Sequence, residues 1–446
     1  MSNGVSTLMC VAFAASLAVP AWGASGGDGA DLKPGDVLNQ SNWQKAEKLL
    51  PPEILEHYKK GDYANPIVDW PPEVFNWPPD FLEATEKNAG QFSIGPHGDI
   101  IDTTTGKQPP YIFGLPYPKI DAADPQAAIK ILWNFFYRTW YFGNLHAQSQ
   151  VNWVAPRGLE RRTDQDVNFM YYDGVPKDER PENEQNFSTQ QLIFVTSPSD
   201  LNGTAALTWR YRDPTKRDSA WTYVPALRRV RAISPSNRSD GFLGSDMAQD
   251  DGPFFDGKPE DFDWTVQGQV DQLRFVDPLN LQGKSDHFWI PTGGWRVNWP
   301  EDLKMIGYMD PNWKGVGWAP LSGALAKRRF WVISGVPKDK YYLFGRLEMY
   351  IDTVTFQGAW DRKFSWQGEL LNTMQVMSFI PLPSKRPDGH VDYNQGSNMA
   401  FQCVESIKRG QATVAGIKSD PKAVFDLRIP YDPKFFDMNA LSRFGK

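Results

Sequence analysis

The carboxylates between residues 246 and 263 are the side chains of this chain that could do chemistry most directly. They are Asp246, Asp250, Asp251, Asp256, Glu260, Asp261 and Asp263. Such a group could bind Ca²⁺, or supply a pair such as Asp250 and Glu260 for hydrolysis of a glycan or ester bond. It lacks the ligand order and the glycine of an EF-hand loop. We therefore expect loop charges or partners for nearby arginines, and a secreted hydrolase is the least favoured function.

Four arginines lie close to this acidic segment in the sequence. They are Arg228, Arg229, Arg231 and Arg238. A guanidinium group forms paired hydrogen bonds with a carboxylate and binds anionic headgroups in the same way. Pairing with the acidic segment is the safer expectation. The alternative is a rim that meets a lipid headgroup or a partner protein, with Arg229 and Arg231 as candidates.

Other catalytic patterns are absent from the sequence. The five histidines are scattered without the spacing of a zinc or iron site, and there is no nucleophile elbow, phosphate loop or dinucleotide fingerprint. Cys403 lies in an alternating run with Met399 and Phe401, which predicts a buried structural thiol. We assign no catalytic residue, no metal and no cofactor, and we do not expect an enzyme.

The elements around these charges begin with a hairpin that has one aromatic face. Leu207, Trp209 and Tyr211 alternate with Thr208, Arg210 and Arg212, and after a turn at 213–218 the pattern resumes at Trp221 and Tyr223. Side chains alternate between the two faces of a strand. The five apolar residues therefore share one face, which is either ordinary core or the lining of a cavity.

Helical patterns lie on both sides of the strand-rich region. Residues 41–58 look helical, and Asp124-Pro125 begins an amphipathic helix that ends near Gly143. Asp432-Pro433 predicts a short C-terminal helix through Arg443. Strand patterns occupy 192–196, 330–334, 341–352, 374–379 and 399–407.

These patterns predict an α+β fold with a large curved antiparallel sheet and helices packed on or in its concave face. No composition break divides the strand-rich region, so we expect one large domain over 41–446. Its part 41–145 is helical and carries a strap with two Trp-Pro-Pro units, at 70–75 and 77–81. Residues 24–40 are expected to be a flexible leader.

Residues 1–23 resemble a cleaved secretory signal peptide. The apolar stretch Leu8–Pro20 is shorter than a bilayer-spanning helix needs, and small residues follow it at Ala21 and Gly23. A membrane anchor is the rival interpretation. The net charge of −6 offers no basic field for nucleic acid.

Several longer motifs resemble the bacterial domain-of-unknown-function 1329 family. They include residues 207–214, 221–231, 234–240, 244–247, 251–257, 307–313, 321–331 and 337–342. The similarity covers nearly the whole chain after the signal. It implies an open half-barrel similar to the LolA/LolB lipoprotein carriers, a periplasmic location, and work beside an inner-membrane exporter and an outer-membrane protein.

The leading hypothesis from the sequence is a periplasmic binding or carrier protein for a hydrophobic, lipid-like molecule. Its predicted cavity lining is Leu207, Trp209, Tyr211, Trp221 and Tyr223, with Arg229 and Arg231 at the rim. An envelope adaptor or assembly protein with a fully packed interior is the alternative.

Overall fold

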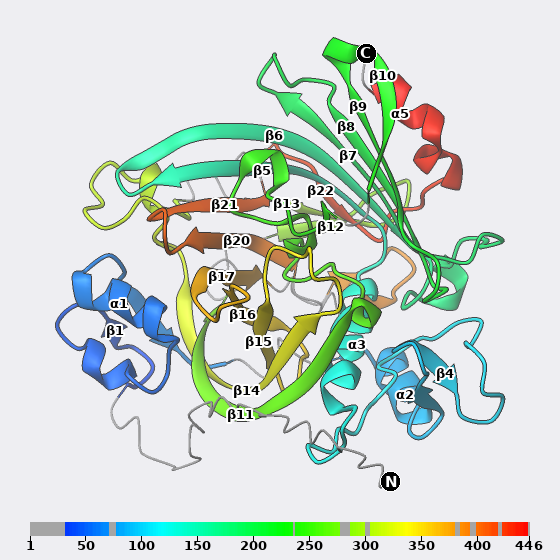
Figure 1. Cartoon of the computed structure of the whole chain (residues 1–446), viewed down its shortest axis with the longest axis horizontal. Helices are drawn as coiled ribbons and strands as arrows, with labels where there is room; N and C mark the ends of the chain where they lie inside the picture. Colours follow the sequence, from blue (N-terminus) through cyan, green and yellow to red (C-terminus); the bar gives the residue numbers. More distant parts are fainter. Residues whose placement is uncertain are drawn as a thin grey trace, which may run out of the picture.

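Most of the described chain is β-sheet, in agreement with the alternating apolar and polar residues. The computed structural model describes residues 32–70, 77–234, 237–276, 286–298, 304–379, 384–392, 398–417 and 422–444. One sheet of 18 strands curves around a helix and a loop on its inner side (Figure 1). The expected α+β fold with a curved, open antiparallel sheet is confirmed. The predicted signal peptide 1–23 lies outside the described residues.

The first half of the sheet is a run of six antiparallel neighbours. They are β5 (Leu145–Ala155), β6 (Gly158–Tyr171), β7 (Phe187–Ser197), β8 (Ala205–Tyr211), β9 (Ser219–Val224) and β10 (Arg229–Ile233). Among the described strands, β10 pairs only with β9, so it forms a free edge.

The second half returns to β5 from the other side. Its strands, in order of pairing, are β11 (Phe262–Val276), β14 (Ala324–Pro337), β15 (Arg346–Asp352), β16 (Gly358–Phe364), β17 (Leu370–Phe379), β20 (Asn398–Ser406) and β21 (Gln411–Ile417). β21 then pairs with β5. The strand predicted from Tyr341 begins only at Arg346: residues 341–345 form a turn in which the Asp339 carboxylate accepts a hydrogen bond from Tyr341 N.

Shorter strands complete the sheet and its surroundings. β22 (Phe425–Leu427) joins β5 to the pair β13 (Trp295–Asn298) and β12 (Asp286–Trp289), and β2 (Asn65–Val68) joins β1 (Val37–Leu38) to β14. Two separate pairs are β3 (Phe92–Ile94) with β4 (Ile100–Asp102) and β18 (Ser384–Lys385) with β19 (Val391–Asp392).

The helix predicted after Pro125 is α3 (Ala127–Trp140), and it packs on the inner side against β11 and β14. Ile131 and Leu132 are fully buried in its apolar stripe. The helix begins slightly later than the Asp124-Pro125 pattern predicts, and its N-cap residue is Gln126. The Asp124 carboxylate accepts a hydrogen bond from Gln126 N at 2.8 Å. No described helix has the length and apolarity needed to cross a membrane.

Regular structure in the described N-terminal region begins at β1, which lies inside the predicted flexible leader 24–40. Leu38 in β1 is fully buried, and the helical region comprises η1 (Trp43–Ala46) and α1 (Pro52–Lys60). The first Trp-Pro-Pro unit falls mostly on residues 71–76, which lie outside the described residues. In the second unit, Pro79 begins α2 (Pro79–Lys87), and Trp77 stacks on Phe81 at 4.6 Å.

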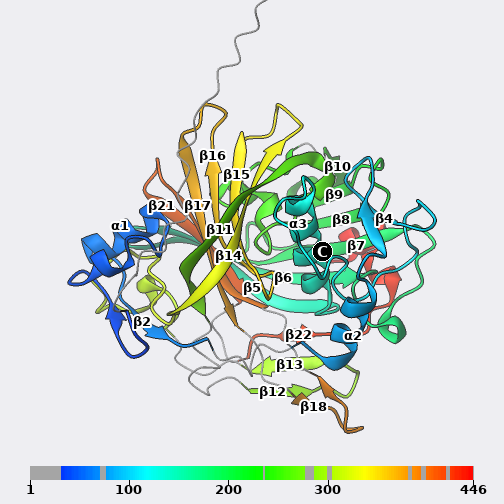
Figure 2. The same cartoon turned by 90° about the horizontal axis from the view of Figure 1, so that it is seen from below.

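The C-terminal segment covers the outer face of the sheet. It consists of η10 (Pro433–Phe436) and α5 (Met438–Phe444), and α5 packs on β8 and β9. In Figure 2, α3 lies in front of strands β6–β8, whereas the red C-terminal segment lies behind them. The two faces of these strands are therefore covered by different elements. The remaining short 3₁₀ turns are η3 (Lys177–Glu179), η4 (Pro225–Leu227), η6 (Phe242–Gly244), η7 (Gln249–Asp251), η8 (Pro259–Asp261) and η9 (Gly307–Met309).

Candidate functional site

An apolar cavity of about 240 Å³ lies on the inner face of the sheet. Its lining from the sheet is Leu145, Ala147, Ser149, Val151, Gln165, Val167, Phe169, Tyr171, Gln191, Ile193, Ala206, Thr208, Gln402, Ala415, Gly416, Phe425 and Leu427. Apolar walls with a small number of polar groups are typical of sites for hydrophobic small molecules.

The strand register explains why these side chains converge. Residues directly opposite each other on neighbouring strands point to the same face of a sheet. Two cross-strand rows run from β5 to β8. The first row is Ala147, Val167, Ile193 and Ala206, and the second row is Leu145, Phe169, Gln191 and Thr208. Small side chains at the β8 end of both rows leave open space above the sheet.

The residues 237–261, which we name the inner loop, cover this face. The loop runs between β10 and β11 and is drawn in green across the hollow side of the sheet (Figure 1). Its cavity-facing residues are Arg238, Phe242, Met247, Ala248, Gln249, Gly252, Pro253 and Asp256. Thr139 at the end of α3 and Phe142 and Gly143 just after it also line the cavity. The loop and the helix end thus cover part of the cavity on the side away from the sheet.

Ion pairs hold the inner loop against the sheet. The carboxylate of Asp251 pairs with Lys363 on β16, and that of Asp246 pairs with Arg409 and accepts a hydrogen bond from Gln411 at 3.0 Å. Asp251 and Lys363 are both almost fully buried. Breaking one partner of a buried pair leaves an uncompensated charge, so these contacts fix the position of the loop.

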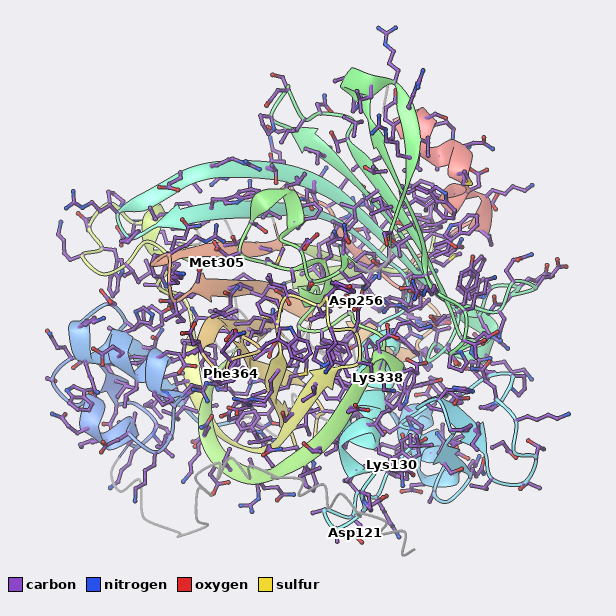
Figure 3. All side chains as sticks on the ribbon, in the orientation of Figure 1. Asp121, Lys130, Asp256, Met305, Lys338 and Phe364 are labelled. Carbon is purple, nitrogen blue, oxygen red and sulfur yellow. The ribbon has the colours of Figure 1, made fainter. Side chains whose placement is uncertain are left out.

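A second ion network closes the polar end of the cavity. Arg238 contacts Asp250, Asp256 at 3.2 Å and Asp218 at 3.3 Å. Arg210 on β8 contacts Asp218 at 3.0 Å and Asp256 at 2.9 Å. Burial lowers the pKa of Arg238, but the three carboxylates outweigh this effect and raise it above its usual value. Asp256 is labelled near the centre of the molecule in Figure 3.

The predicted partnership between arginines and acidic residues is therefore realised by Arg238. Arg229 and Arg231 lie exposed on β10, and within the described chain no salt bridge joins either of them to a carboxylate. Arg228 ends η4 with a left-handed backbone, φ 48°. Arg210, which sequence reasoning did not single out, is the second cation of the network.

The five residues predicted to line a cavity lie on the outer face of the hairpin. Leu207, Tyr211 and Tyr223 are buried in a cluster with Phe436 and Leu441, and Trp209 and Trp221 pack against that cluster. The indole N–H of Trp209 donates to the backbone oxygen of Phe436 at 2.8 Å. The inner-face cavity is lined instead by Ala206 and Thr208 of the same strand. Ligand contact by the five outer-face residues stays a prediction.

The proposed hydrolytic pair has little freedom to act as one. Asp250 pairs with Arg238 and accepts a hydrogen bond from Tyr342 OH at 3.0 Å. Glu260 lines a separate small cavity of about 40 Å³ next to Asp99, and its Oε2 accepts no hydrogen bond from the described part of the chain. Burial raises the pKa of Glu260 to about 7.

Cys403 is fully buried in β20. Burial raises the pKa of its thiol well above the usual value. A thiol that stays protonated is a poor nucleophile, as expected for a structural cysteine.

The inner-face residues could have been found by reading the hairpin pattern for its other face. Ala206 and Thr208 alternate with Leu207 and Trp209. The larger aromatic side chains on the opposite face fill their own space in the cluster under the C-terminal segment. The signal that favours the opposite face is the small size of its residues, because small side chains leave room for a ligand whereas large ones fill the space themselves.

Solved structures with a similar arrangement have low sequence identity to this chain. A DUF1329 family protein from Desulfovibrio piger is 16% identical with a TM-score of 0.45, and the alignment covers 72% of this chain and 100% of that one. A domain from Vibrio parahaemolyticus described as an outer membrane lipoprotein-sorting protein domain is 16% identical with a TM-score of 0.44, and the alignment covers 72% of this chain and 100% of that one. A LolA superfamily protein from Nitrosomonas europaea is 12% identical with a TM-score of 0.38, covering 69% of this chain and 96% of that one.

No curated protein matches the chain. The family described as "Protein of unknown function (DUF1329)" matches residues 37–442, which is nearly all of the sequence after the predicted signal and leader. The resemblance expected from the motifs is thereby confirmed, and the chain belongs to the DUF1329 family.

Proposed function

We propose that this protein is a periplasmic, non-enzymatic binder or carrier of a hydrophobic, lipid-like molecule. The observation that carries the proposal is the apolar cavity of about 240 Å³ between the inner face of β5–β8 and the inner loop. Its walls are mostly aliphatic and aromatic, with a few polar side chains such as Gln165, Gln191 and Gln402. Its charged residues Arg238 and Asp256 are paired with each other. An interior of this kind favours an apolar guest over a polar substrate.

The energetic requirement of a lipid carrier supports the same function. A sixteen-carbon chain that leaves a membrane loses on the order of 12 kcal/mol, at about 0.8 kcal/mol per buried CH₂. A carrier must replace that burial with its own apolar surface. Val167, Phe169, Ile193 and Met247 supply such surface, whereas the packed interior of an adaptor protein would not need to leave it open.

The proposed place of action is the periplasm, which the predicted signal peptide and the family resemblance support. The predicted signal peptide 1–23 would direct export, and an inner-membrane exporter and an outer-membrane protein are the partners we propose. Native mass spectrometry with lipid extraction, on protein purified from its own envelope, identifies the bound molecule. Recovery of the protein without any bound amphiphile would speak against the carrier function.

Filling the cavity tests whether it is the binding site. Ala206 lines the cavity, so Ala206→Trp should lower the affinity for 1-hexadecanol by about tenfold or more, since the indole occupies the space of the guest. The matched control is Ala232→Trp, because Ala232 is exposed on β10 and does not line the cavity. Binding by isothermal titration and folding by circular dichroism are measured for both variants. Equal affinity in the two folded variants would contradict the assignment.

A further inference from the structure

The cavity-bearing face of the sheet does not end at β8. Ala206 lies opposite Thr222 on β9, which lies opposite Arg231 on β10. The row of Ala147, Val167, Ile193 and Ala206 thus continues to Thr222 and Arg231. Arg229 is two residues away on the same strand and points to the same side. Both arginines therefore lie on the face that carries the cavity.

This continuation is open to solvent. Thr222 and Ala220 are half-buried, whereas Arg229 and Arg231 are exposed. Neighbouring strands are about 4.8 Å apart, so Arg231 lies about 10 Å beyond Ala206 across the sheet. A ligand that leaves the cavity along β9 would reach the two guanidinium groups.

The arginines on this face differ in whether they form ion pairs. Arg238 at the cavity wall is already committed to the carboxylates of Asp218, Asp250 and Asp256. Arg229 and Arg231 make no salt bridge with any residue that the structure describes. Residues 219–234 contain no Asp or Glu. The arginines on this face that can bind an added anion are therefore Arg229 and Arg231 on β10.

The size of the cavity requires a larger ligand to protrude. Sites that enclose a drug-sized molecule measure about 300–1,000 Å³, and this cavity measures about 240 Å³. A long-chain amphiphile would keep part of its tail inside and its head outside. The inner loop and the end of α3 cover part of the cavity, whereas Arg229 and Arg231 on the same face of β10 are exposed.

We infer that the ligand is an anionic amphiphile, with its tail in the cavity and a carboxylate or phosphate head bound by Arg229 and Arg231. The inference rests on the proposed function and specifies its substrate class. Guanidinium groups bind both oxyanions through paired hydrogen bonds. A carboxylate head and a phosphate head thus share the recognition chemistry, and the choice between them is left to the experiment.

The test compares ligands that share a tail and differ in the head. Palmitate, hexadecyl phosphate and 1-hexadecanol are titrated, below their aggregation concentrations, against the wild-type protein and R229Q/R231Q. We expect the double variant to bind the preferred anionic ligand about tenfold more weakly or worse and to bind 1-hexadecanol unchanged. The larger of the losses for palmitate and hexadecyl phosphate identifies the head.

A matched pair of single variants separates specific contact from net charge. R231Q and R228Q remove the same charge three residues apart, but Arg228 lies in the turn before β10. R231Q should weaken binding of the anionic ligand, and R228Q should change it less than twofold. Equal effects of the two variants would overturn the inference, as would binding of inorganic phosphate alone with the same sensitivity to R229Q/R231Q.

The outcome for the neutral ligand separates this inference from the proposed function. If wild-type protein binds palmitate, hexadecyl phosphate and 1-hexadecanol equally and R229Q/R231Q has no effect, the anionic head is refuted but the carrier function stands. If none of the three ligands binds, the proposed function fails. Exposed charges also protect edge strands against pairing with other chains. Self-association of R229Q/R231Q with unchanged ligand affinity would assign the arginines to that role instead.

Discussion

At the scale of single residues, one step along β8 decides which surface a side chain serves. Leu207 is fully buried on the outer face under the C-terminal segment, whereas Ala206 and Thr208 line the inner cavity. Because strand side chains alternate strictly, a shift of one residue exchanges the two faces. The small size of Ala206 and Thr208 indicates which face has room for a ligand, but the contacts of the helices and loops decide which face is filled.

Glu260 gives a prediction for the pH dependence of stability. Burial raises its pKa to about 7, from 4.5 in the unfolded chain. Below pH 4.5 the acid is neutral in both states, so its burial carries no charge penalty. As the pH rises from 4.5 to 7 the unfolded chain releases the proton first, so the folded state loses stability, and the loss is complete above pH 7. The loss amounts to about 3 kcal/mol for such a shift. In Glu260→Gln the side chain does not titrate, so this part of the loss should disappear.

The measurement compares the free energy of unfolding of wild type and Glu260→Gln by urea denaturation at pH 4.5, 6 and 8.5. The difference between the two proteins should shift in favour of the variant as the pH rises. Asp261→Asn is the control, because Asp261 is exposed on the same turn. Parallel pH profiles for wild type and Glu260→Gln would show that Glu260 does not titrate as its burial requires.

At the scale of elements, local patterns predicted the helices and strands better than their contacts. The helix after Pro125 is found as α3, and the helix after Pro433 as η10 and α5. Both carry strong local signals, a proline at the start and an apolar stripe. The inner loop has no such periodicity, and its position depends on partners far along the chain, such as Lys363 and Arg409 for Asp251 and Asp246. Those pairings could not be read from the sequence.

The outer-face hairpin and α5 carry the next prediction. We propose Leu207, Trp209, Tyr211, Trp221 and Tyr223 as a second ligand-contacting surface, which requires the C-terminal segment to move away from the sheet. In that case the double variant Trp209→Ala/Trp221→Ala should lose most of its bound lipid while it remains folded. Lipid occupancy is measured by native mass spectrometry and stability by urea denaturation.

A folded double variant with unchanged lipid occupancy would rule out this surface. Ala206→Trp serves as the comparison, because it changes the inner face of the same strand without touching the cluster under α5. Loss of binding in Ala206→Trp alone would place the ligand entirely on the inner face.

At the scale of the whole molecule, the cavity unites strands that are distant in sequence. Its lining comes from β5–β8 and from β20–β22, and β21 joins the two halves of the sheet through β5. A ligand in this position contacts residues from Leu145 to Leu427. The binding site therefore depends on the assembled sheet rather than on any one segment.

This arrangement predicts that ligand stabilises the described domain as one unit. A ligand that binds only the folded state adds about 2.7 kcal/mol at a free concentration of 100 times its Kd. Because both halves of the sheet line the cavity, thermal unfolding followed by circular dichroism and by tryptophan fluorescence should shift upward together when ligand is added. Because its affinity is expected to be tenfold lower or worse, Ala206→Trp should gain about half of this stabilisation or less at the same ligand concentration, while Ala232→Trp should shift as the wild type does. Two separate transitions, of which only one responds to ligand, would mean that the halves of the sheet unfold independently and that the cavity belongs to one of them.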